Sequence, residues 1–185
     1  MKRLLPLEVV LALVMLIVPL QQYPVQAAGA REVTVNFDDF SAPCFFDETH
    51  ALRSFGSLAF VGGGAILNKC GDFGVAGYSR PNFLAFNCDA QDKNNNECGL
   101  PETIIFPKGA VNVSLTLGSA YDAGQTVVVS AVRHGGNRKQ QTIALSGKLK
   151  PVTFHGAISR VTIESPSVCV LVVDSIRFRQ GGAHP

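Results

Sequence analysis

The residue of this 185-residue sequence that most clearly requires a chemical partner is an aspartate inside an apolar segment, residues 168–179. Asp174 shares alternating parity with Val172 and Ile176. Successive side chains of a strand point to opposite faces, so the pattern predicts that Asp174 points the same way as the core residues. A carboxylate buried there needs a cation or several hydrogen-bond donors, because its burial alone is too costly.

A second aspartate, Asp39, repeats this parity after the alternating residues Val33, Val35 and Phe37. If the first and last strands are neighbours, the two carboxylates approach from the same side. Calcium takes six to eight oxygen ligands, so such a pair would begin a structural calcium site. We therefore assign Asp39 and Asp174 as candidate Ca²⁺ ligands. The alternative is that each carboxylate caps a turn or accepts backbone N–H groups.

Residues of the types used in catalysis form no recognisable motif. The histidines have no His-x-x-x-His spacing that would indicate zinc, and no Gly-x-Ser-x-Gly segment occurs. Cys169 and His155 could be imagined as a thiol dyad, but an apolar strand in an exported protein favours a buried thiol. The sequence thus predicts a protein that is not an enzyme, with a hydrolase that uses two acids as a distant alternative.

The first 27 residues read as a signal peptide. A short basic start precedes an apolar run, 9–18, that Pro19 ends, and small residues suited to cleavage follow at Ala27 or Ala30. Ten apolar residues are too few to span a bilayer, which takes about 20. We therefore expect a secreted protein, extracellular or periplasmic, without an integral membrane span after cleavage.

The five cysteines all follow this segment, and an oxidising compartment makes disulfides the default. Cys88 and Cys98 bracket a polar loop that has little else to order it, so we expect them to pair. Cys44 and Cys70 lie in turn-like contexts and are the second expected pair. Cys169 lies in an apolar strand and is expected to stay a thiol.

Helical periodicity is almost absent, whereas alternation of apolar and polar residues recurs throughout. It is clearest over residues 111–117 and 125–132. Roughly nine or ten short strands, separated by turn residues, predict an all-β antiparallel sandwich of jelly-roll type. We expect a single domain over residues 31–179 and a flexible tail over 180–185.

The order of these landmarks resembles secreted bacterial jelly-roll modules of the galactose-binding-domain-like type, a class that includes carbohydrate-binding modules. The likeness is carried by residues 35–39, 79–86 and 173–178. It implies neighbouring first and last strands, often near a structural calcium ion, and a non-catalytic module that binds glycans or decorates larger surface proteins. The sequence departs from the usual sugar-binding composition, since it has no Trp and only two Tyr after the expected leader.

Two functions follow as expectations. The first is a binding module for glycans or cell-surface polymers, and the alternative is a structural or interaction protein of the cell envelope. Nucleic acid is not an expected partner, because removing Lys2, Arg3 and Glu8 leaves 14 basic against 13 acidic residues and no basic stripe. Such sandwiches place binding residues on loops. The candidates are Tyr78, Arg80 and Asn82 in one loop, and Arg133, His134, Asn137 and Arg138 in another.

Overall fold

A computed structural model describes residues 31–44, 52–71, 74–87, 101–165, 168 and 170–180. Within these ranges the chain forms ten strands, a short 3-10 turn at Lys69–Gly71 and no α-helix. The strands are β1 (Glu32–Val35), β2 (Ser54–Phe55), β3 (Leu58–Val61), β4 (Ala65–Asn68), β5 (Asn82–Asn87), β6 (Glu102–Gly118), β7 (Thr126–Arg133), β8 (Arg138–Ala144), β9 (Lys150–Glu164) and β10 (Val170–Gln180).

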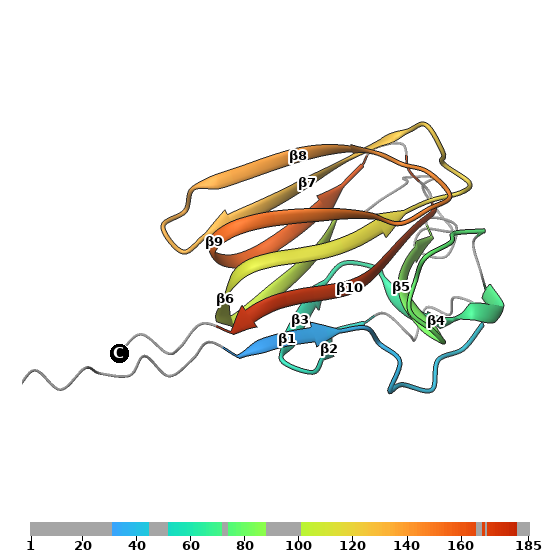
Figure 1. Cartoon of the computed structure of the whole chain (residues 1–185), viewed down its shortest axis with the longest axis horizontal. Coiled ribbons are helices and arrows are strands. Elements are labelled where there is room, and N and C mark those ends of the chain that lie inside the picture. The colour runs from blue at the N-terminus through green and yellow to red at the C-terminus, as the bar shows by residue number, and fades with distance from the viewer. Residues whose placement is uncertain are drawn as a thin grey trace, which may run out of the picture.

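The strands pair in the order β4-β5-β10-β6-β9-β7-β8, with β1 on β10, β3 on β6 and β2 on β3 (Figure 1). Every pairing between these strands is antiparallel. The first part of β6 pairs with β3 and its later part with β10, with a register shift against β9 between Ile105 and Ala110. Such irregularities bend strands, so a long strand such as β6 can contribute to both layers of the sandwich. The predicted antiparallel β-sandwich is confirmed, and its first and last strands are neighbours as expected.

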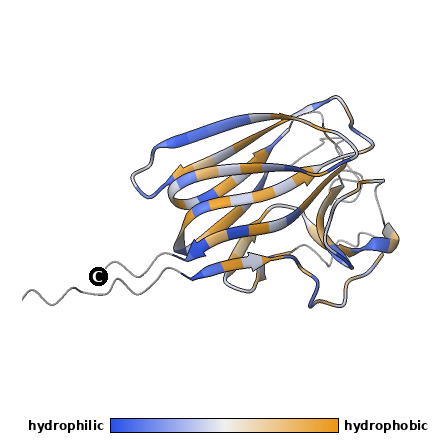
Figure 2. Cartoon of the chain, in the orientation of Figure 1, coloured by the Kyte–Doolittle hydropathy of each residue, from blue (hydrophilic) through white to orange (hydrophobic). Residues whose placement is uncertain are grey.

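Two apolar clusters flank the sheet around β5 and β10. The main core fills the sandwich and contains Leu84 of β5 and Val173 of β10. A second cluster covers the opposite face, where Phe83, Ala85 and Val172 pack with residues from the connecting segments. At the other edge of the sheet, most of β8 is hydrophilic and faces solvent (Figure 2). At the end of the sandwich that contains β5, both faces of the sheet are therefore covered by apolar side chains.

The last strand contains an irregularity that the alternation did not predict. Ser175 has a φ of 51°, and the pairing of β10 with β6 shifts register between Asp174 and Arg177. Val173 lies in the main core before this point, and Ile176 lies there after it. The shift exchanges the two faces, so Asp174 is buried on the outer face of the sheet and not in the main core. Asp174 is fully buried on the same side as the core residue Val172, as predicted, whereas the prediction that it also points the same way as Ile176 was wrong.

The structure contains the expected disulfide between Cys44 and Cys70. The expected Cys88–Cys98 pair, the thiol assigned to Cys169 and the signal peptide lie outside the described residues. Of the tail expected over 180–185, Gln180 is the last residue of β10, and residues 181–185 lie outside the described residues. Within the described part of the chain, no helix has the length and apolar character needed to cross a membrane.

Candidate functional site

A row of polar side chains crosses four strands on the outer face of the sandwich. Thr34 of β1 lies opposite Arg177 of β10, Arg177 lies opposite Ser114 of β6, and Ser114 lies opposite Thr153 of β9. Residues paired across antiparallel strands point to the same face. The Thr153 hydroxyl donates to the Ser114 hydroxyl at 3.1 Å. We call this surface, between β1 and β9, the polar face.

The polar face is hollowed beside this row. A hollow of about 290 Å³ is lined by Glu32, Asn112, Ser114, Arg177, Phe178 and Arg179. Phe178 keeps its ring in the core, where it packs edge-on against Phe106. The hollow therefore presents carboxylate, amide, hydroxyl and guanidinium groups to solvent, which together supply both donors and acceptors.

One edge of the hollow is built by a tight local arrangement of β6 and β9. Asn112 has a φ of 56°, and its side-chain oxygen accepts the N–H of Gly156 at 3.1 Å. The Arg133 guanidinium lies over Gly156 and donates to the carbonyl of His155 at 2.9 Å. A side chain at residue 156 would meet the guanidinium. The structure thus brings one of the predicted ligand-binding residues, Arg133, to the edge of the hollow.

The other predicted residues of the 133–138 loop do not contribute to the edge of the hollow. Arg138 is paired with the carboxylate of Glu164 at 3.1 Å and with the Ser130 hydroxyl at 2.8 Å. His134 lies against Gly109 of β6, which leaves no room there for a Cβ. Asn137 is exposed in the β7–β8 turn. These contacts hold a hairpin in place and define no shared pocket.

The candidates from the 78–82 loop lie elsewhere. Figure 1 shows the β7–β8 turn on the left and β4 and β5 on the right, so the two candidate loops lie at opposite ends of the sandwich. Tyr78 packs edge-on against Phe83, with ring centroids 4.9 Å apart, and belongs to the second apolar cluster. Arg80 is exposed beside them. The two loops do not form one concave surface.

Asn82 is a structural residue. It is fully buried, and its amide donates to the carbonyls of Phe37 and Phe40 while its oxygen accepts from Asn68. Its own backbone N–H donates to the Asp38 carboxylate at 3.2 Å. A side chain committed in this way has no hydrogen-bonding group left for a ligand, so we remove Asn82 from the candidate binding set.

Asp174 anchors the 78–82 loop to the sheet. Its carboxylate accepts the N–H of Ser79 at 2.5 Å, the Ser79 hydroxyl at 3.1 Å and the N–H of Ser175 at 2.6 Å. Burial raises the pKa of Asp174, these hydrogen bonds lower it, and the charge of Asp38 raises it further. This is the alternative arrangement, in which the acid accepts backbone N–H groups.

A calcium ion held by Asp39 and Asp174 stays a prediction, and the arrangement counts against it. Phe37 has a φ of 63°, which ends the alternation of β1 and leaves Asp39 exposed. The acid that acts on Asp174 is Asp38, whose carboxylate is already used by Asn82. Among the described residues, no group of three or more His, Cys, Asp or Glu side chains is placed to hold a metal ion.

Sequence reasoning missed a buried acid at the start of β6. Glu102 is 2% exposed, and its carboxylate accepts the N–H of Gly64 at 3.1 Å. A Cβ at Gly62 would lie 2.0 Å from the same oxygen, so the glycine-rich bend between β3 and β4 makes room for this carboxylate. Its other oxygen has no partner among the described residues. Burial raises the pKa of Glu102 to about 7, while the Gly64 N–H and the charge of Arg53 lower it.

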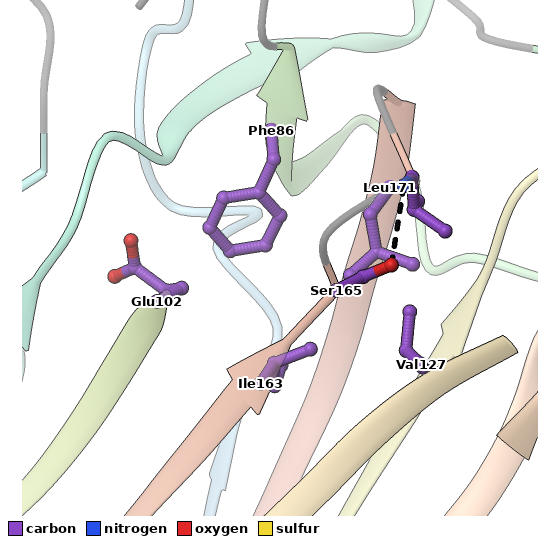
Figure 3. A pocket seen from close by; sticks show the side chains of 7 residues that line it. Phe86, Glu102, Val127, Ile163, Ser165 and Leu171 are labelled. Atoms are coloured by element: carbon purple, nitrogen blue, oxygen red, sulfur yellow. Dashed lines mark hydrogen bonds between the residues drawn. The ribbon is translucent and has the colours of Figure 1, made fainter. Parts of the chain in front are cut away.

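Glu102 borders a hollow of about 30 Å³, lined also by Phe86, Val127, Ile163, Ser165, Val168 and Leu171 (Figure 3). Figure 3 shows the Phe86 ring beside Glu102 and the other side chains grouped around the hollow. That volume holds about one water molecule, so no sugar ring fits there. We therefore treat Glu102 as a buried acid of the fold.

Stability should fall as the pH rises from about 4.5 to about 7. The native state keeps the Glu102 proton to about pH 7, whereas the unfolded chain loses it near the ordinary glutamate pKa of 4.5. The native state therefore binds more protons in this window, and the loss should be about 3 kcal/mol in urea unfolding. Glu102→Gln should remove most of this slope, whereas Glu164→Gln should not. An unchanged slope in Glu102→Gln would contradict the assignment.

No protein-family model matches the chain, and no curated protein sequence matches it. Among solved structures, an exo-β-agarase matches with a TM-score of 0.50 and 8% identity, over 81% of this chain and 26% of the enzyme. The K2 cleaved adhesin domain of Lys-gingipain matches with a TM-score of 0.47 and 12% identity, over 83% of this chain and 100% of that domain.

A CBM61 module in complex with β-1,4-galactotriose matches with a TM-score of 0.46 and 10% identity, over 70% of this chain and 92% of that module. At these identities the likeness shows the fold alone. The antiparallel strands of this chain form the predicted β-sandwich, and the resemblance stated from the sequence is confirmed for that fold alone.

Proposed function

We propose that this chain is a secreted, non-catalytic module that binds glycans on its polar face. The observation that carries the proposal is the row of exposed and half-buried polar side chains across β1, β10, β6 and β9, beside a hollow of about 290 Å³. The side chains come from paired strands, and sites built on regular elements are held more rigidly than sites on loops. The binding surface is therefore the sheet, and the two predicted loops are secondary to it.

The chemistry of the face suits a polyhydroxylated ligand. Each sugar hydroxyl both donates and accepts, and the face offers hydroxyls at Thr34, Ser114 and Thr153, an amide at Asn112 and a carboxylate at Glu32. Among the described residues of this face there is no Tyr or Trp side chain on which a sugar ring could stack. Binding should therefore depend on hydrogen bonds and charge, several along one polymer chain.

A hydrolytic role has no comparable support. Glycosidases use two carboxyl groups that flank the scissile bond. Of the two hollows described above, the smaller is bordered by one acid, Glu102, and the larger by one acid, Glu32. Asp38 and Asp174 do lie close enough to influence one another, but both accept hydrogen bonds from the fold. This arrangement favours binding without catalysis.

Affinity electrophoresis of the purified protein, in gels that contain single soluble polysaccharides, tests the proposal. At least one polysaccharide should retard the protein, and the double substitution Thr34→Ala, Ser114→Ala should weaken that binding about thirtyfold, since two lost hydrogen bonds at about 1 kcal/mol each amount to about 2 kcal/mol. The matched control is Thr126→Ala, Thr142→Ala, which changes two exposed hydroxyls of β7 and β8. Absence of retardation in every gel would contradict glycan binding and favour the cell-envelope structural protein.

A further inference from the structure

We propose that the ligand of the polar face is an acidic polysaccharide, one whose repeating sugars carry carboxylate or sulfate groups, and that Arg177 and Arg179 bind those groups. This inference rests on the proposed function and specifies its ligand. The two arginines are exposed and lie two residues apart on β10, so they emerge from the same face about 7 Å apart. Both line the hollow.

The two guanidinium groups are available for a ligand. Among the described residues, neither side chain makes a hydrogen bond or an ion pair with another side chain or with the backbone. Two other arginines are engaged within the fold, since Arg138 is paired with Glu164 and Arg133 donates to the His155 carbonyl. A guanidinium presents parallel N–H donors that match the oxygens of a carboxylate or sulfate. An exposed pair of this kind favours an anionic partner over a neutral one.

The surroundings distinguish the two arginines. Arg177 lies between Thr34 and Ser114, which carry no charge, so its positive charge is uncompensated by its register neighbours. Arg179 lies opposite Glu32 of β1. The Glu32 carboxylate should repel an anionic group bound near Arg179. We therefore assign Arg177 as the main anion-binding residue and Glu32 as a residue that limits affinity.

The neighbouring hydroxyls make this an arrangement for a sugar and not for an isolated anion. Thr34 and Ser114 flank Arg177 in register, and Thr153 continues the row. A uronate or sulfated sugar seated over Arg177 would place its ring hydroxyls over these side chains. The guanidinium would bind the acidic group, and the row would bind the sugar that carries it.

The test is affinity electrophoresis with four polymers. Polygalacturonate supplies carboxylates, its fully methyl-esterified form is the neutral match, dextran sulfate supplies sulfates, and dextran is the neutral match for it. We expect the acidic member of at least one pair to bind the protein at least about tenfold more tightly than its neutral match, a factor that one charge-assisted interaction supplies. Which acidic polymer is preferred then separates carboxylate from sulfate recognition.

Three substitutions assign the effect to residues. Arg177→Gln should weaken binding of the acidic polymer about tenfold, Glu32→Gln should strengthen it, and Arg160→Gln, which removes an exposed arginine of β9, should change it little. Polyglutamate, an anion without sugar rings, should bind much more weakly than the acidic polysaccharide. Equal binding of polyglutamate would overturn the sugar assignment.

The outcomes separate this inference from the function it rests on. Binding of neutral and acidic members with equal affinity, or no effect of Arg177→Gln, would overturn the anion assignment and leave glycan binding in place. No binding of any polysaccharide, these four included, would overturn both. Added sodium chloride should weaken the interaction, because salt screens exposed charges.

Discussion

Replacing Asn82 with alanine is expected to lower the free energy of unfolding by about 3 kcal/mol. The substitution removes the amide that donates to the carbonyls of Phe37 and Phe40, and the oxygen that accepts from Asn68. A buried acceptor that loses its donor carries its full desolvation cost. Chemical denaturation with urea measures the change, as a shift in the midpoint at constant slope.

Two further variants make this test specific. Asn137→Ala removes an exposed asparagine from the β7–β8 turn and should change stability by less than about 0.5 kcal/mol. Asn82→Asp should destabilise at least as much as Asn82→Ala at neutral pH, because it places a carboxylate against two carbonyls. A stability of Asn82→Ala equal to that of the original protein would show that the segment after β1 is held by other contacts.

Removal of the Cys44–Cys70 disulfide is expected to cost about 3 kcal/mol. The bridge closes a loop with a sequence separation of 26 residues, and constraining a loop of this length in the unfolded chain contributes about that amount. The double substitution Cys44→Ala, Cys70→Ala should therefore shift the urea midpoint strongly. It should also raise proteolysis near residues 31–44, which the bridge ties to the 3-10 turn at Lys69–Gly71.

Reduction separates this bridge from the expected Cys88–Cys98 pair. If Cys44–Cys70 is the bridge that matters for stability, reduction should bring the original protein to the stability of the double variant. A further loss on reducing the double variant would show a second bridge, as the cysteine spacing predicts. A double variant as stable as the oxidised protein would contradict the contribution assigned to Cys44–Cys70.

The architecture was predictable because alternation reports directly on burial. The residues that alternate over 111–117 form the later part of β6, and Val113, Leu115 and Leu117 are fully buried. The pairing of β1 with β10 followed from the fold resemblance. Alternation does not report irregularities such as the positive φ at Ser175, and one such residue reversed the face assigned to Asp174.

The candidate site was harder to predict because it depends on register between distant strands. No pattern within a single strand reports that β10 lies beside β6 with Arg177 opposite Ser114. The sequence analysis placed the binding residues on loops instead, and one of these residues, Asn82, is buried. The sequence feature that could have indicated the polar face was the pair of arginines at alternate positions of the last strand. The feature that could have indicated the buried acid Glu102 was weaker, since it was only an acid at the start of an apolar strand.

The most direct test of the account is amide chemical-shift mapping by NMR during titration with the polysaccharide that binds best in electrophoresis. The shifts should concentrate on β1, the 112–114 segment of β6, the 153–156 segment of β9 and the 177–179 segment of β10. Residues 78–81 should change little. Binding with its shifts confined to residues 78–81 or to the 134–137 turn would contradict the assignment of the polar face.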